Sequence, residues 1–334
     1  MLTDNPKRAL VLSGGGGRGA YHVGVLRFLE EHEWYPDVVV GTSIGAVNGA
    51  ALASGHTANS LWALWRKLRT KHVQKPNWNP FSAVSLLDTS PLKETLLNEG
   101  WVDFERINDP EKTAVHLRIT ATEISTGLLH IFSNSLNDKT EITVEHILSS
   151  CSIPLIYPHT HLGATKYWDG AVVANTPLSA AIATGAEEII VVIMTPIKQT
   201  GDDSSLPTLP TNLPTNLYEA ASMTLEWALL ASFQADMKMF SLINSLAEIR
   251  DELDKIQADY PDVVDQYMQD MNNFVGANVK HDYKKLKYPT IVCPKDFIPV
   301  EQIVSYTQKW HEKLYKMGYD DARAAWEREG YPVE

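Results

Sequence analysis

Short apolar runs and stretches of helical periodicity alternate along the first fifty residues. Residues 8–13 (RALVLS) form an apolar run that stops at four glycines, and the segment AYHVGVLRFLEEH after them repeats its apolar side chains with helical spacing. A second apolar run at residues 38–40 ends at Gly41, and the small residues that follow (AVNGAALASG) suit a helix packed closely on a sheet. This order of strand, helix, strand and helix predicts a parallel sheet with helices on its faces.

The same alternation continues to about residue 196. The pattern predicts a helix at 58–70, two strands within 115–133, helices at 143–152 and 177–186, and a buried strand at 187–195. We therefore expect an α/β fold of three layers, α/β/α, in which helices cover both faces of a mainly parallel central sheet.

Beyond residue 196 the composition changes. Residues 197–216 are rich in Pro, Thr, Ser and Asn, which predicts a loop or linker. Further helices are predicted at about 218–256, 261–274 and 301–329, with a last strand within 288–294. The sequence thus predicts an α/β core at 8–196, a loop at 197–216 and a mainly helical C-terminal extension at 217–334.

The glycine run after the first strand admits two interpretations. Residues 13–19, S-G-G-G-G-R-G, contain the spacing G-x-G-x-x-G between a strand and a helix, as in dinucleotide-binding proteins. Such proteins need an acidic residue at the end of the second strand, where this chain has Gly41, Thr42 and Ser43. A phosphate-binding P-loop is excluded because no Gly-Lys-Ser/Thr follows the glycines. The other interpretation is an oxyanion hole, formed by the unshielded N–H groups of residues 15–17.

The second strand ends in G-T-S-I-G, a G-x-S-x-G sequence at residues 41–45. A serine on a sharp strand-to-helix turn needs neighbours without side chains, which Gly41 and Gly45 provide. Such a turn presents Ser43 Oγ at the carboxyl edge of the sheet, with a helix N-terminus beneath it. Ser43 is therefore the candidate nucleophile, and the glycine loop can supply its oxyanion hole.

A nucleophilic serine also needs a proton acceptor. One candidate is Asp169 in K-Y-W-D-G-A, where Asp-Gly marks a turn after the end of a strand. Partial burial beside Tyr167 and Trp168 would raise the carboxyl pKa above its usual value of about 3.9 and make it a better base. The rival is a Ser-Asp-His triad, for which the chain offers His159, His161, His281 and His311.

Taken together, S-G-G-G-G-R-G, G-T-S-I-G and D-G-A resemble, in their order, the motifs of the patatin-like phospholipases, lipid acyl hydrolases with a Ser-Asp dyad. The resemblance covers about residues 8–196 and implies a patatin-like fold. It makes Ser43 the nucleophile and Asp169 its base. It assigns the oxyanion and substrate-binding loop to Gly14, Gly15, Gly16, Gly17, Arg18 and Gly19. It places the supporting motif positions at Gly41, Gly45, Gly170 and Ala171.

The resemblance implies a serine esterase that cleaves fatty acyl esters of phospholipids or lysophospholipids through an acyl-enzyme, with no cofactor and no metal. A Ser-Asp-His esterase of other acyl esters and a dinucleotide-binding protein stay open as alternatives. The helix predicted at 218–256 is apolar around most of its girth, so we expect it either to pack in the core or to form a lid or acyl-channel wall.

The composition limits the kinds of partner that the chain can bind. The chain has 29 Lys and Arg against 41 Asp and Glu, and its net charge of -12 opposes binding to nucleic acid and adsorption to anionic membranes. No targeting segment and no run of ~18 apolar residues is visible, so we expect a cytoplasmic protein that contacts membranes or micelles transiently at their surface. The two cysteines, Cys151 and Cys293, have no ligand spacing and are expected to be buried thiols. The oligomeric state is left open.

Overall fold

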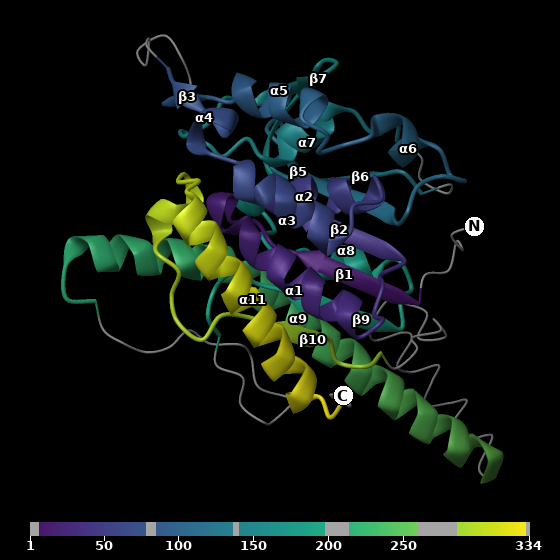
Figure 1. The fold of residues 1–334 in the computed structure, drawn as a ribbon. Helices are drawn as coiled ribbons and strands as arrows, with labels where there is room; N and C mark the ends of the chain where they lie inside the picture. The colour runs from purple at the N-terminus through teal and green to yellow at the C-terminus, as the bar shows by residue number, and fades with distance from the viewer. Residues whose placement is uncertain (1–6, 78–84, 136–139, 198–213, 260–285, 332–334) are drawn as a thin grey trace.

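The computed structural model describes residues 7–77, 85–135, 140–197, 214–259 and 286–331. An eight-stranded sheet runs through the molecule (Figure 1). Its order is β10 (Thr290–Val292), β9 (Glu188–Val192), β1 (Arg8–Leu12), β2 (Val38–Thr42), β5 (His116–Glu123), β8 (Thr165–Asp169) and β7 (Thr160–Leu162), with β6 (Leu129–Ser133) paired to β5. The strands from β10 to β5 are parallel, and β6, β7 and β8 are antiparallel to their neighbours. The predicted mainly parallel sheet is confirmed.

Helices cover both faces of this sheet. They are α1 (Ala20–Glu31), α2 (Ile44–Ala53), α3 (Ala58–Lys67), α4 (Thr70–Val73), α5 (Ser90–Asn98), α6 (Phe104–Asn108), α7 (Val144–Ser150), α8 (Leu178–Ile182), α9 (Leu217–Asp259) and α11 (Gln308–Arg328). Short 3-10 turns lie at Gly16–Gly19 (η1), Gly170–Val172 (η3) and Val300–Ile303 (η4), and a small hairpin pairs β3 (Lys75–Pro76) with β4 (Leu87–Asp88).

The strand β1 shows why two cores form. Its side chains alternate between the two faces of the sheet, as in any strand. Leu10 and Leu12 join the core shared with α1, α2, α3 and α11, whereas Ala9 and Val11 join the core shared with α8 and α9. All four are fully buried. The three-layer α/β/α arrangement therefore follows from the continuous apolar runs of the central strands.

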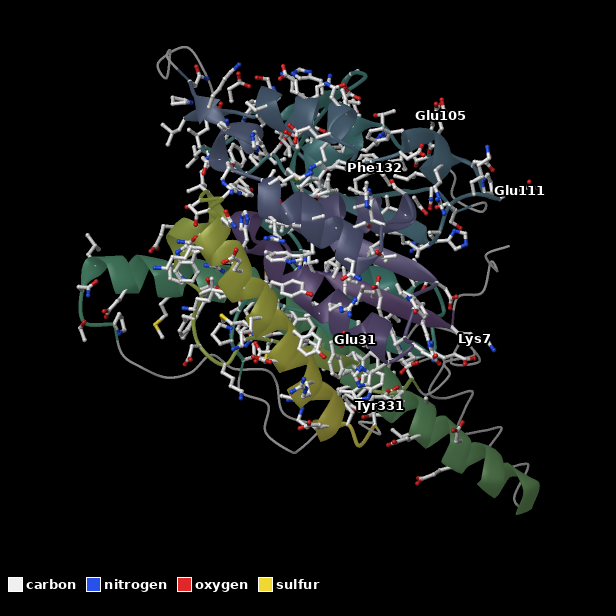
Figure 2. The ribbon with its side chains drawn as sticks, in the orientation of Figure 1. Lys7, Glu31, Glu105, Glu111, Phe132 and Tyr331 are labelled. Atoms are coloured by element: carbon white, nitrogen blue, oxygen red, sulfur yellow. The ribbon has the colours of Figure 1, made fainter. Side chains whose placement is uncertain are left out.

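The C-terminal residues are built into this arrangement. The strand β10 extends the sheet by pairing parallel to β9, and α11 packs lengthwise on α1 (Figure 1). Backbones touch at that crossing, because a Cβ on Gly318 would lie 2.0 Å from the carbonyl oxygen of Tyr21. From the middle of α11, Tyr319 donates a hydrogen bond to Glu31, and Tyr331, just after the helix, donates one to Glu188. Glu31 and Tyr331 are labelled in Figure 2.

The long helix α9 confirms the helix predicted at 218–256. One stripe, including Leu230, Phe233 and Met237, is buried against the sheet, as core packing predicts. Other apolar side chains of α9, including Trp227 and Leu242, are exposed. Most of the predicted loop at 197–216 and the helix predicted at 261–274 lie outside the described residues. No helix of the described ranges is long and apolar enough to cross a bilayer.

Candidate active site

Two strands that run in opposite directions end at the same point of the sheet. Thr42, the last residue of β2, pairs with Thr120 of β5, while Asp169, the last residue of β8, pairs with the next residue, Ala121. The other edge of β5 is occupied by β6 at both positions, so β2 and β8 lie end to end along one edge. The chain leaves β2 at Ser43, and the candidate nucleophile therefore emerges beside the candidate base.

Ser43 occupies the strained turn that its sequence predicts. Its backbone has φ 56° and ψ -123°, a conformation that costs a non-glycine residue energy. A Cβ on Gly41 would lie 2.4 Å from the carbonyl oxygen of Gly45, and a Cβ on Gly45 would lie 2.1 Å from that of Leu12. Both glycines are thus required by the close approach of the backbone. The N–H of Ser43 donates to Ser150 Oγ at 2.8 Å, which fixes the turn.

Asp169 is held by its backbone and by one oxygen of its carboxyl group. Its N–H donates to the carbonyl of Ser152 at 2.9 Å, and its Oδ1 accepts the N–H of Ala171 at 2.8 Å. Gly170 is needed between them, since a Cβ there would lie 2.4 Å from Thr120 Oγ1. Oδ2 is buried without a hydrogen bond of good geometry among the described residues, and Ser43 is the side chain that interacts with this carboxyl group.

Burial decides the protonation behaviour of Asp169. The side chain is 1% exposed, and this desolvation raises its pKa to about 7, even though hydrogen bonds from Ser43 and the Ala171 N–H act to lower it. At neutral pH the carboxyl group is therefore close to half ionised. A base with a pKa near the operating pH is the best compromise between being ionised and accepting a proton strongly.

The glycine loop lies directly against Ser43. A Cβ on Gly14 would be 3.2 Å from the Cβ of Ser43, so this position accepts no side chain without displacement. The N–H of Gly14 donates to the carbonyl of Asn175 at 3.1 Å and is not available to a substrate. Gly16 lines the same cavity as Ser43. The loop thus brings backbone beside the nucleophile, with Gly14 as a spacer.

Arg18 points away from this site. Its Nη1 lies 2.8 Å from Glu226 Oε1 of α9, its Nη2 donates to the carbonyl of Ile298 at 2.9 Å, and its side chain is 1% exposed. It is not among the residues that line the cavity at Ser43. The expected contact of Arg18 with substrate is therefore not made by its side chain in this structure.

A narrow, largely apolar cavity of about 20 Å³, with room for about one water molecule, opens from Ser43. Its walls come mainly from the start of α2, from α4 and α5, and from the loop after α7. The lining residues are Gly16, Ser43, Ile44, Val47, Leu68, Val73, Leu92, Thr95, Leu96, Trp101, Cys151, Ile153, Tyr157 and Tyr306. The Cys151 thiol interacts with the Ser43 hydroxyl, and burial raises its pKa well above the usual range, so it stays a neutral thiol.

The comparison with known families agrees with this geometry. The model of the family described as patatin-like phospholipase matches residues 10–182, more than half of the chain. The chain belongs to the patatin-like phospholipase family. The match includes Ser43, Asp169 and the whole glycine loop from Gly14 to Gly19.

Three curated relatives of the chain carry the names of lipid hydrolases. The chain is 30% identical over 200 residues to lysophospholipase NTE1 of Meyerozyma guilliermondii, covering 57% of this chain and 13% of that protein. It is 27% identical to triacylglycerol lipase 5 of Saccharomyces cerevisiae, covering 52% of this chain and 28% of that protein. It is 28% identical to the cGAMP-activated phospholipase of Escherichia coli, covering 52% and 54%. The chain therefore spans well under two thirds of the length of these relatives.

Two solved structures align with nearly the whole chain. VipD from Legionella pneumophila aligns with a TM-score of 0.44 and 12% identity, covering 97% of this chain and 67% of that chain. The type III effector protein ExoU aligns with a TM-score of 0.38 and 13% identity, covering 97% and 53%.

The candidate histidines of a triad lie elsewhere in this patatin-like fold. His159 and His161 contact each other through their Nε2 atoms at 3.1 Å. His311 is fully buried under Trp65, whose carbonyl it contacts at 2.9 Å, and burial lowers its pKa to about 4. No histidine lines the cavity at Ser43 among the described residues. His281 lies outside those residues.

The sequence did not predict which residues line the cavity. Leu92 and Leu96 are four residues apart, which indicates an amphipathic helix, but nothing in this spacing connects α5 to Ser43. Trp101 and Cys151 line the cavity as well and were not expected there. Among the described residues, α9, for which a lid or acyl-channel wall was the alternative to core packing, contributes none of the lining side chains, and Tyr306 is the one lining residue that follows residue 217.

Proposed function

We propose that this member of the patatin-like phospholipase family is a serine lipid acyl hydrolase that works through an acyl-enzyme on Ser43, with Asp169 as its base. One observation carries the proposal. The strained Ser43 interacts with the buried carboxyl group of Asp169 and lines an apolar cavity. A nucleophile, a base matched to neutral pH and an apolar binding space are the parts that ester cleavage in a lipid requires.

In the proposed reaction Asp169 acts twice. Its carboxylate takes the proton of Ser43 Oγ as that oxygen attacks the ester carbonyl carbon, and the protonated acid then gives this proton to the leaving alcohol. The acyl group stays on Ser43 Oγ. Asp169 next takes a proton from a water molecule as the water oxygen attacks the carbonyl carbon of the acyl-enzyme. Asp169 then gives this proton to Ser43 Oγ, and the bond from Oγ to the acyl group breaks to release the fatty acid.

The negative charge that develops on the carbonyl oxygen needs donors. We assign them to the glycine loop, where Gly16 lines the cavity and Gly15 and Gly17 are its neighbours. The N–H of Gly14 is already bonded to Asn175 and is left out of the assignment. Each donor of this kind typically contributes about 3–4 kcal/mol to lowering the barrier.

The substrate class follows from the cavity and from the family. The side chains that line the cavity, including Leu92, Leu96 and Trp101, are mainly apolar, which favours an acyl chain over a charged group once the cavity widens to admit it. The named activities of the curated relatives, on phospholipids, lysophospholipids and triacylglycerols, agree with acyl-ester cleavage. We propose fatty acyl esters of phospholipids or lysophospholipids, reached by transient contact with a membrane or micelle surface.

The proposed chemistry resides in residues 8–196, and the region from 217 onward completes the site. Tyr306 closes part of the cavity, and Glu226 holds Arg18 of the glycine loop. The buried stripe of α9 supports a packing role for this helix.

Labelling with a fluorophosphonate probe tests the proposal. The probe reacts with activated serines, and peptide mass spectrometry locates it. We expect one label per chain, on Ser43, and labelling at least 100-fold slower in Asp169→Asn because the proton acceptor is lost. A folded wild-type protein that resists labelling, or that is labelled elsewhere, contradicts the assignment. Binding of NAD by the same sample would favour the dinucleotide alternative instead.

A further inference from the structure

The ion pair between Arg18 and Glu226 joins the glycine loop to α9 in the interior. The two charged groups are 2.8 Å apart, and their side chains are 1% and 2% exposed. Removing two charges from water is costly, and a well-packed apolar pair often stabilises a fold as well or better. Stability therefore does not by itself account for a charged pair at this place.

The carboxylate of Glu226 connects two segments beside the site. Its Oε1 faces Arg18 in the loop after β1, and its Oε2 accepts a hydrogen bond from Thr195, just after β9. The neighbouring Met194 lies against the same loop, since a Cβ on Gly15 would be 2.4 Å from its Cε. Glu226 thus fixes the glycine loop against the adjacent strand end.

The other side of the loop is held by backbone. Arg18 Nη2 donates to the carbonyl of Ile298, and a Cβ on Gly16 would lie 1.9 Å from the carbonyl oxygen of Ile303. A Cβ on Gly17 would lie 2.2 Å from that of Ser305. The loop is therefore clamped between the segment 298–305 and the Glu226 carboxylate, with Arg18 as the link between them.

We propose that Glu226 is a positioning residue, which acts through Arg18 to hold the glycine-loop N–H groups where the substrate oxyanion forms. This inference rests on the proposed function of Ser43 and of the loop. Neither Arg18 nor Glu226 lines the cavity, so substrate binding does not depend on them directly. Donors held for the oxyanion act on the transition state, and their displacement lowers kcat while KM changes little.

A matched pair of isosteric substitutions on α9 gives the first test. Glu226→Gln removes the charge that holds Arg18. Asp236→Asn removes a carboxylate of the same helix that accepts the N–H of Ser179 at 2.9 Å and does not touch the loop. On p-nitrophenyl butyrate we expect kcat to fall at least tenfold with KM within twofold in Glu226→Gln, and both constants within twofold in Asp236→Asn. A Glu226→Gln enzyme with kcat within twofold of wild type would overturn the proposal.

A double substitution separates positioning from stability. Glu226→Met leaves the guanidinium of Arg18 buried and unpaired, which lowers Tm, and adding Arg18→Met removes that charge and restores Tm. Positioning predicts that kcat stays low in the double variant although Tm recovers, whereas recovery of kcat together with Tm would overturn it. Every rate is corrected for that of Ser43→Ala. A wild-type rate no higher than the Ser43→Ala rate would refute the proposed function itself, and with it this inference.

Discussion

The buried carboxyl group of Asp169 loses its proton near neutral pH, because burial raises its pKa to about 7. Only the ionised form can take the proton of Ser43. The side chain lies at the end of β8 and is 1% exposed, so the carboxyl group gains and loses its proton inside the protein.

Activity should accordingly follow the ionisation of Asp169. We expect kcat/KM on a soluble short-chain ester to rise with pH and to level off above an apparent pKa of about 7. Initial rates between pH 5 and pH 9, on enzyme shown by circular dichroism to stay folded, measure this profile. A profile that is flat from pH 5 to pH 9 would show that another group is the base.

The same shift has a consequence for stability. The folded-state pKa of Asp169 lies above the unfolded-state value, so the folded protein binds a proton that the unfolded chain has already lost. This contribution to stability is full at pH values below about 4 and is lost as pH rises through about 7. A pKa raised from 3.8 to about 7 corresponds to at most about 4 kcal/mol of free energy of unfolding.

Asp169→Asn should therefore change the pH dependence of stability. An amide does not ionise, yet its oxygen can still accept the N–H of Ala171, so the turn is kept. We expect the Tm of Asp169→Asn, relative to wild type, to be higher at pH 8 than at pH 5. Thermal unfolding of both proteins at the two pH values measures it, and an equal Tm difference at both would contradict the buried ionisation.

At the residue scale the sequence predicted a candidate nucleophile and a candidate base but not their surroundings. The glycines around Ser43 and after Asp169 are steric requirements, and such requirements are visible in a sequence. The resemblance to the family placed Arg18 in the oxyanion and substrate-binding loop, whereas its side chain is paired with Glu226. Its partner Glu226 lies more than two hundred residues later, and no local pattern connects the two.

Among the elements, α5 has the largest unforeseen role, since it supplies one wall of the cavity. Leu92 and Leu96 face the space beside Ser43, while Leu97 of the same helix is 47% exposed. If the acyl chain of the proposed substrate enters between these side chains, their size limits how much of the chain can enter. The choice of chain length is thus expected to depend on α5.

Narrowing the cavity at α5 should discriminate between long and short acyl chains. We expect Leu92→Trp to lower kcat/KM on a p-nitrophenyl ester of a long fatty acid at least tenfold, and on the acetate ester less than threefold, because only the long chain reaches the added ring. Leu97→Trp adds the same bulk to the exposed side of the helix and should leave the ratio unchanged. An equal loss on both esters in Leu92→Trp would show that the acyl chain lies elsewhere.

The strand–helix alternation of the first 196 residues was predictable because buried parallel strands are continuous apolar runs. The meeting of β2 and β8 at Thr120 and Ala121 was not, because strand pairing over separations of about fifty to eighty residues leaves no local mark in the sequence. That meeting brings Ser43 and Asp169 together. The prediction that Ser43 and Asp169 act together came from the resemblance to the family's motifs and not from the pattern of apolar residues.

For the molecule as a whole, the elements within residues 286–331 are part of the central layers. The strand β10 continues the sheet, and α11 lies on α1 at a distance that only glycine permits at Gly24 and Gly318. The composition change at residue 197 predicted a loop followed by a helical extension. Composition does not report where the elements of that extension pack.

A methyl group in the α1–α11 contact should loosen the whole fold. A Cβ on Gly318 would meet the Tyr21 carbonyl at 2.0 Å, so Gly318→Ala forces the two helices apart, and we expect the free energy of unfolding to fall by about 1–3 kcal/mol. Lys309→Ala, on the exposed side of α11, should change it by less than about 0.5 kcal/mol. Urea unfolding of the three proteins gives these values, and Gly318→Ala with wild-type stability would contradict the close contact.

In the proposed reaction Ser43 and Asp169 together cleave acyl esters of lipids. The decisive measurement is fatty acid release from lysophosphatidylcholine and from phosphatidylcholine vesicles by wild type, Ser43→Ala and Asp169→Asn. We expect the wild type to release fatty acid from at least one of the two lipids, and each variant to be at least about 1,000-fold slower, because neither group can act without the other. Release at the wild-type rate by folded Ser43→Ala or Asp169→Asn would contradict the proposed reaction.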